Sequence, residues 1–316
     1  MIDDTELAVR PPRWRRYGVR LIGVVLFAAV LASVDLRQVW DSISRISLDA
    51  LVEALGLLVL LLLLKCGRWF LLLTWSGIPQ SVAESVDVYA DSIFWGMITP
   101  GRLGELKRTL YLKRRHTIPL VRGSALWLVD QGFDILALIA ILVAASLAQP
   151  EVLGRALPVE AAWGAAAVLA ASLVLRNGFL RLLRLSTSHT GRFRYLVDEA
   201  TRDLLNIGHG RFLILFAMSS GAMLAYVGMV IALSADLPIA LSIAQQMTAV
   251  PLVMASALLP ISYFNFGSRE LVLTGVFALY GHGFADAISY SFVFVLCYLL
   301  VIPVSVLLSR LGRFLG

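Results

Sequence analysis

Two polar segments interrupt apolar parts of the chain, and each ends in an arginine–glutamate pair. Their sequences are TPGRLGE at residues 99–105 and PISYFNFGSRE at residues 260–270. Proline and glycine break helices, and a helix that starts after a break presents backbone N–H groups and the positive end of its dipole. A neighbouring arginine adds a planar fork that can bind phosphate through two hydrogen bonds. Each segment therefore has the chemistry to bind an anionic group such as a lipid phosphate.

The breaks fall at Gly101 and Gly267, with Arg102 and Arg269 beside them. As an alternative, proline and glycine only turn the chain at the membrane surface, and the arginines reach toward the headgroups. The presence of a segment in each half of the chain favours a binding site, because broken, charged helices at corresponding places indicate the substrate site of transporters.

Four carboxylates accompany these arginines. Glu105 and Glu270 follow them at short spacing and are expected to pair with them, with proton exchange during transport as the alternative. Asp130 and Asp134 share one face of an apolar run, and a carboxylate in hydrocarbon costs about 2.5–3.5 kcal/mol on insertion scales. Both aspartates should therefore face protein or a water-filled cavity, as a proton or cation site, a counter-ion or a structural ion pair. Their expected partners are Lys65, Arg68, Arg102 and Arg269.

The elements that must position these groups are membrane helices. Of the 316 residues, 59% are hydrophobic and only 15% are charged, whereas soluble domains have about 25% charged residues. A spanning helix needs about 20 mostly apolar residues. Uninterrupted spans are predicted at 18–35, 48–75, 120–148, 160–176, 211–234 and 285–309, and interrupted ones at 82–100 and 240–282.

The orientation follows from the distribution of lysine and arginine, which are enriched in cytoplasmic loops. Basic residues gather before the first span, after the first interrupted segment, in a loop at about 177–210 and at the C-terminal end. Both termini are therefore predicted to be cytoplasmic, and the two interrupted segments enter the bilayer from opposite sides. The sequence predicts one all-α membrane domain over residues 1–316, with six to eight transmembrane helices plus re-entrant or broken helices. An inverted repeat would relate its halves, about 1–150 and 155–316.

Other functions lack their sequence signals. The net charge of +6 accompanies no nucleic-acid-binding motif, and no phosphate-binding loop for ATP or zinc-binding HExxH motif occurs. No cofactor or metal is expected. Cys66 and Cys297 are interpreted as buried apolar residues, and the N-terminal region shows no cleavable signal pattern.

The segment Pro100-Gly101-Arg102-Leu103-Gly104-Glu105, with Arg108 and Lys113 behind it, resembles the flippase-like membrane domain family of lysylphosphatidylglycerol synthases. The pattern Pro260-x-Ser262 … Gly267-x-Arg269-Glu270 resembles that family's second motif, and Phe133-Asp134 matches its aspartate-bearing helix. The resemblance implies a multi-pass bacterial or archaeal plasma-membrane protein that moves lipids between leaflets. The chain departs from the family in lacking the soluble aminoacyl-transferase domain, in Asp130-Gln131, which replaces a Glu–Arg pair, and in Tyr263-Phe264-Asn265, which replaces a Gly-rich stretch.

The resulting hypothesis is a non-enzymatic transporter that flips an anionic or polar-headed lipid, such as an aminoacylated phospholipid or a lipid-linked intermediate. A membrane-embedded headgroup or sugar transferase and a non-catalytic scaffold of a lipid-synthesis complex are the alternatives. A second copy of the chain or a lipid-biosynthesis enzyme could be a partner. The substrate-binding residues are predicted to be Gly101, Arg102, Glu105, Arg108, Asp130, Asp134, Gly267, Arg269 and Glu270.

Overall fold

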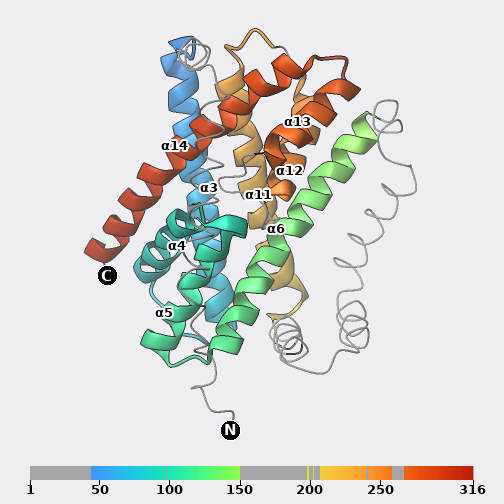
Figure 1. Ribbon diagram of the computed structural model, residues 1–316. Helices are drawn as coiled ribbons and strands as arrows, with labels where there is room; N and C mark the ends of the chain where they lie inside the picture. Colours follow the sequence, from blue (N-terminus) through green and yellow to red (C-terminus); the bar gives the residue numbers. More distant parts are fainter. Residues whose placement is uncertain are drawn as a thin grey trace, which may run out of the picture.

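Helices account for all the regular secondary structure that the computed structural model describes (Figure 1). The described residues are 44–97, 99–149, 198, 202, 207–239, 241–257 and 267–315. The predicted basic loop at about 177–210 lies almost wholly outside them, as do the predicted spans 18–35 and 160–176. The protein is an all-α membrane protein, as the sequence predicts.

Four helices in the described part are long and apolar enough to cross a membrane. They are α3 (Leu48–Trp75), α6 (Leu120–Ala148), α11 (His209–Ser234) and α14 (Phe284–Leu315). They coincide with four of the six uninterrupted spans predicted from sequence. The count within the described residues is thus lower than the predicted six to eight. Each helix has 26 to 32 residues, more than the about 20 that span a bilayer, so it must tilt or extend beyond the hydrocarbon.

The interrupted segments form shorter helices. The first consists of α4 (Val82–Met97), a 3-10 helix η2 (Pro100–Leu106) and α5 (Lys107–His116). The second consists of α12 (Ile243–Ser256) and α13 (Ser268–Leu279), and residues 258–266 between them lie outside the described part. The helix that begins at Pro100-Gly101 is the 3-10 helix η2, and the α-helix α5 follows it. In Figure 1, α4 and α5 lie in the lower half of the molecule, and α12 and α13 lie in the upper half.

A close approach of backbones fixes the turn between α4 and η2. The Thr99 hydroxyl accepts a hydrogen bond from the Gly104 N–H at 2.6 Å. A Cβ atom on Gly104 would lie 2.1 Å from the backbone oxygen of Trp95, so only glycine fits there. Arg102 adopts φ 56°, in the left-handed region that residues with a side chain rarely occupy. The turn therefore holds Arg102 in an unusual backbone conformation.

The long helices pack in pairs. Helix α3 packs along α11, where a Cβ atom on Gly221 or Gly228 would be 3.2 Å from a leucine of α3. Helix α14 packs along α4, where Gly312 approaches the backbone of Ala83 and Asp87. Small residues let membrane helices approach closely, which compensates for the weak hydrophobic drive between helices in lipid. Helix α6 packs against α11 and α12 and completes the bundle.

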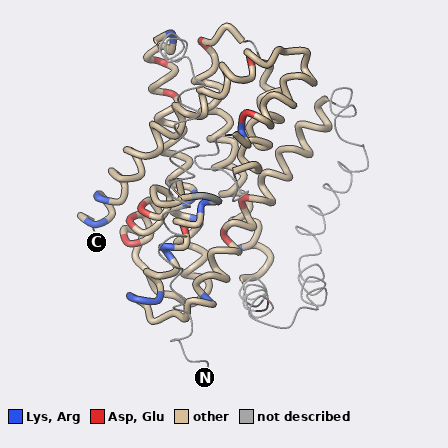
Figure 2. Tube along the Cα trace, viewed as in Figure 1, with Lys and Arg blue, Asp and Glu red and all other residues tan. Residues whose placement is uncertain are grey.

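The charged residues are distributed unevenly over the fold. Figure 2 shows lysine and arginine on α5 at the lower end of the molecule, and further charged residues inside the lower half of the bundle. Basic residues fill the last turn of α5: Lys113, Arg114, Arg115 and His116. The charge rule therefore favours the cytoplasmic side for the lower end, and this orientation stays a prediction.

Candidate functional site

An alternating chain of charged side chains, all of them buried except Arg102, connects four elements of the bundle. It runs through η2, α5, α6 and α3, and each member forms an ion pair with the next. In order, its members are Arg102, Glu105, Arg108, Asp130, Arg68, Asp134 and Lys65.

The first half of the chain joins η2 and α5 to α6. Glu105 pairs with Arg102 at 2.7 Å and with Arg108 at 3.1 Å, both within one helical turn. Arg108 then reaches Asp130 on α6 at 2.9 Å. The predicted pairing of Glu105 with Arg102 is thus present, and the structure brings four of the sequence-predicted residues together.

The second half joins α6 to α3. Arg68 bridges the two aspartates, with 2.7 Å to Asp130 and 2.5 Å to Asp134. Lys65 binds the other oxygen of Asp134 at 2.6 Å. The two aspartates lie four residues apart on α6, and the two cations lie three residues apart on α3. Both spacings are about one helical turn, so each pair shares one face of its helix and the two faces meet. Lys65 and Arg68 are among the expected partners of the aspartates, but sequence reasoning did not assign them to the site.

Aromatic and hydroxyl groups surround the buried arginines. The Arg108 guanidinium carbon lies 4.5 Å from the ring centroids of both Trp69 and Tyr89. The Tyr89 hydroxyl donates to Asp130 at 3.2 Å, and the Ser219 hydroxyl on α11 donates to Asp134 at 3.1 Å. The sequence offers no direct signal for these roles, because aromatic residues in membrane helices occur mostly as anchors and packing groups.

The second interrupted segment forms its own ion pair. The Nε atom of Arg269 donates to Glu270 at 2.9 Å, and the arginine side chain is buried. The other carboxylate oxygen of Glu270 accepts the Gly267 N–H at 2.6 Å. A protein carboxylate thus occupies the start of α13, where the sequence suggested a free site for a substrate anion. Gly267 has φ 86°, a conformation that favours glycine.

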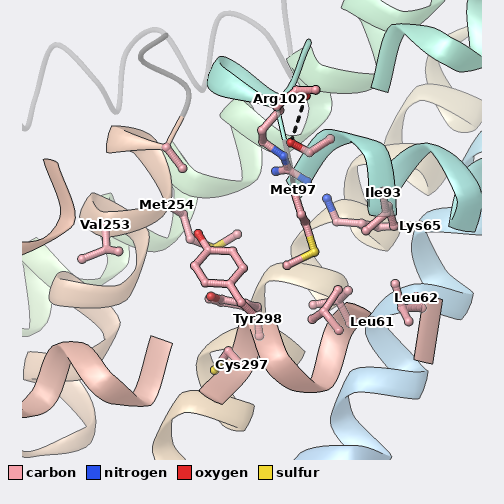
Figure 3. Close-up of a pocket in the computed structure, with 15 residues that line it drawn as sticks. Leu61, Leu62, Lys65, Ile93, Met97, Arg102, Val253, Met254, Cys297 and Tyr298 are labelled. Carbon is pink, nitrogen blue, oxygen red and sulfur yellow. Dashed lines mark hydrogen bonds between the residues drawn. The ribbon is translucent and has the colours of Figure 1, made fainter. Parts of the chain in front are cut away.

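A pocket lies between α3, α4, α11, α12 and α14, next to the charge chain. It measures about 100 Å³, enough for several water molecules but not for a whole lipid. Its charged lining groups are the two ends of the chain, Arg102 and Lys65, and the rest is mainly apolar. Figure 3 shows Lys65, Met97 and Arg102 on one side of the pocket and Tyr298 across from them.

The pocket is lined by Arg102 from the first arginine–glutamate segment, but not by Arg269 from the second. Tyr226 of α11 and Tyr298 of α14 also line it. The predicted single site for Arg102 and Arg269 therefore stays a prediction. Gly101 lies in η2, at the pocket-side turn that carries Arg102.

A smaller polar cluster fixes α5 against the start of α4. The carboxylate of Glu84 accepts the Tyr111 hydroxyl at 2.7 Å and lies 2.8 Å from Nε2 of His116. Partial burial alone would raise the pKa of Glu84, but these hydrogen bonds outweigh it and lower that pKa. Burial and the bond to Glu84 raise the pKa of Tyr111 to about 12.

The fold and the site define an integral membrane protein whose buried charges end at an amphipathic pocket between its helices. The chain belongs to the family described as the lysylphosphatidylglycerol synthase TM region, whose model matches residues 18–305. Neither the curated proteins nor the solved structures gave a significant match to the chain.

Proposed function

We propose that this protein moves an anionic or polar-headed lipid between the two leaflets of a bacterial or archaeal plasma membrane. The observation that carries the proposal is the composition of the pocket. Two cations, Arg102 and Lys65, lie on one side of a lining that is otherwise mainly apolar. A lipid has the matching chemistry, with a phosphate for the cations and an acyl chain for the apolar wall.

The charge chain supports a binding role for Arg102 in particular. Its partner Glu105 is shared with Arg108, so one carboxylate serves two guanidinium groups. The Arg102 side chain keeps 25% of its surface exposed, whereas that of Arg108 keeps none. Arg102 thus has donors left for a ligand, while Glu105, which Arg108 also binds, holds it in place.

The arrangement of the broken helices supports alternating access to the pocket. Helices α4 and α5 with η2 come from one end of the bundle, and α12 and α13 come from the other (Figure 1). In the proposed inverted repeat, each broken segment would open the pocket toward its own leaflet. After Glu270 releases Arg269, the freed arginine would bind the headgroup. Both termini would lie on the cytoplasmic side.

The test is lipid flipping in reconstituted vesicles. Vesicles carrying the purified protein and fluorescent phosphatidylglycerol are treated with a membrane-impermeant quencher, and the rate at which inner-leaflet lipid becomes quenched is recorded. Wild type should accelerate this rate relative to protein-free vesicles. Arg102→Asn should lose most of the acceleration, because asparagine tolerates a left-handed backbone but lacks the guanidinium. Arg102→Lys should retain part of it.

A matched control is Arg313→Asn, which removes an exposed arginine near the C-terminal end of α14. It should flip lipid at the wild-type rate. Flipping by Arg102→Asn at that same rate would remove Arg102 from the site. If wild type itself does not accelerate flipping, the transferase and the scaffold become the better hypotheses, and they are separated by whether headgroup chemistry occurs on added lipid.

A further inference from the structure

The charge chain carries one more positive group than negative groups. Four cations alternate with three carboxylates, so the chain begins and ends with a cation and its formal charge is +1. The pair of Arg269 and Glu270 adds one charge of each sign and leaves this excess unchanged. Residues 258–266, which follow α12, contain no lysine, arginine, aspartate or glutamate. Within the part of the protein that the structure describes, the excess charge therefore lies in this charge chain, whose two ends at the pocket, Arg102 and Lys65, are both cations.

A buried charge without a counter-charge is costly, by several kcal/mol in a protein interior. The chain can avoid that cost in two ways: an anion enters the pocket, or one of the cations releases a proton. Arginine does not release its proton in proteins, whereas a buried lysine can. Lys65 is the single lysine among the seven members of the charge chain, its side chain is 6% exposed, and it lies at the pocket.

Among the groups around the pocket, Lys65 is the one that we expect to gain and lose a proton. Each carboxylate of the charge chain forms ion pairs with two cations. Arg68 on α3 and Arg102 on η2 add positive charge around Lys65, and Asp134 on α6 adds the negative charge. From α11 and α14 the pocket receives Tyr226, Tyr298 and Cys297, which are protonated acids at neutral pH and take up no further proton.

We propose that Lys65 couples headgroup binding to proton uptake: the pocket is occupied by a monoanionic phosphodiester with Lys65 protonated, and is empty with Lys65 neutral. Binding then adds one negative charge and one proton, so the occupied and the empty site carry the same net charge. Transport of such a lipid is electroneutral and responds to a pH gradient but not to a membrane potential. The proposal rests on the proposed lipid site and adds its energy coupling.

The geometry is compatible with both states of Lys65. A charged lysine has three N–H donors, and within the described residues Asp134 is its hydrogen-bond partner, at 2.6 Å. A neutral amine can keep that bond, and protonation adds a donor. Figure 3 shows the amino group of Lys65 directed toward the side of the pocket where Arg102 lies, so a headgroup between them would contact both.

The test is proton uptake on ligand binding, measured with the purified full-length protein in phosphatidylcholine nanodiscs. A short-chain phosphatidylglycerol is titrated at pH 8 in two amine buffers with different ionisation enthalpies, and the difference in heat gives the protons taken up per ligand. Wild type should take up about one proton per lipid bound. Lys65→Arg should bind the lipid with no proton uptake, because it keeps the charge and the pairing with Asp134 but cannot deprotonate.

Two further arms identify the ligand and protect the test against misfolding. The first arm uses dimethyl phosphate, a phosphodiester without acyl chains. Proton uptake on binding of dimethyl phosphate would support the proposal and would assign recognition to the phosphate. Lys65→Met, folded by the criterion of an unchanged elution volume, should bind lipid more weakly and without proton uptake. Wild-type binding without proton uptake, or equal uptake by Lys65→Arg, overturns the proposal. Proton-coupled binding by a protein that flips no lipid would retain Lys65 as the proton site and remove the flippase function.

Discussion

Arg102 and Lys65 are the two ends of one chain of ion pairs, and both line the same pocket. The members between them each have two oppositely charged partners, whereas each end has one. This difference separates the roles of the residues. Substitutions in the middle of the charge chain should affect the stability of the fold, and substitutions of Arg102 or Lys65 at its two ends should affect what the pocket binds.

Asp130 tests the middle of the chain, because it bridges Arg68 and Arg108 and all three side chains are fully buried. We expect Asp130→Asn to destabilise the protein by about 3–5 kcal/mol, since it leaves two buried guanidinium groups with one counter-charge fewer. The measurement is unfolding in mixed micelles with an increasing fraction of sodium dodecyl sulfate.

The control for Asp130 is Asp91→Asn, on α4. Asp91 pairs with Lys107 at 2.6 Å, but the two side chains are 25% and 47% exposed. Its loss should change stability by less than about 1 kcal/mol, as for other exposed pairs. If the two variants unfold at the same detergent fraction, Asp130 is not an ionised bridge.

The sequence predicts the long helices well and the site only in part. The spans at 48–75 and 120–148 coincide with α3 and α6, because a long apolar run has one stable conformation in lipid. The neighbouring pairs, Arg102 with Glu105 and Arg269 with Glu270, were also expected, since spacing alone brings them together. The single site for both arginines, the inverted repeat and the orientation stay predictions.

Contacts between distant segments could not be predicted in the same way. Arg108 was assigned to the site through its motif, but its place between Trp69 and Tyr89 depends on how α3, α4 and α5 pack. Asp130 had four candidate partners, and periodicity does not choose among them. The structure selects Arg68 and adds Arg108, which was not among the four.

Gly104 tests the turn that positions Arg102. We expect Gly104→Ala to disrupt this turn, because the new methyl group would lie 2.1 Å from a backbone oxygen, which cannot rotate away. The variant should flip lipid poorly and unfold earlier than wild type. Gly132→Ala on α6 is the matched control, since its added Cβ would meet nothing within 4 Å beyond its chain neighbours and the nearby backbone of its own helix. It should be neutral or stabilising by up to about 1 kcal/mol. Equal behaviour of the two variants would contradict the close packing at Gly104.

The hydrogen bonds of Glu84 should make the stability of the α5 end of the bundle depend on pH. Its pKa is lowered in the folded protein below the ordinary 4.5, so its contribution to stability is present above that pH and is lost as the pH falls through the folded value. The stability difference between wild type and Glu84→Gln should thus be present at pH 7 and should shrink as the pH falls below 4.5 toward the lowered pKa of the folded protein. Glu53→Gln, on the exposed surface of α3, should show no such difference in the same thermal unfolding series.

Met97 offers a way to supply the missing negative charge of the pocket from the protein itself. It lines the pocket together with Arg102 and Lys65, and its side chain has nearly the length of glutamate. Met97→Glu should place a carboxylate beside both cations and balance the chain at four charges of each sign. The variant should therefore bind short-chain phosphatidylglycerol at least tenfold more weakly than wild type, a loss of about 1.4 kcal/mol.

The uncharged variant Met97→Gln separates this effect from a change of shape, because it has the same size as the glutamate. It should bind the lipid with an affinity closer to that of wild type. Met97→Glu should also keep Lys65 protonated without a ligand, so any residual lipid binding should proceed without proton uptake. Weak binding by both variants would instead mean that Met97 contacts the lipid through its apolar side chain, and that the charge balance at Arg102 and Lys65 does not control occupancy.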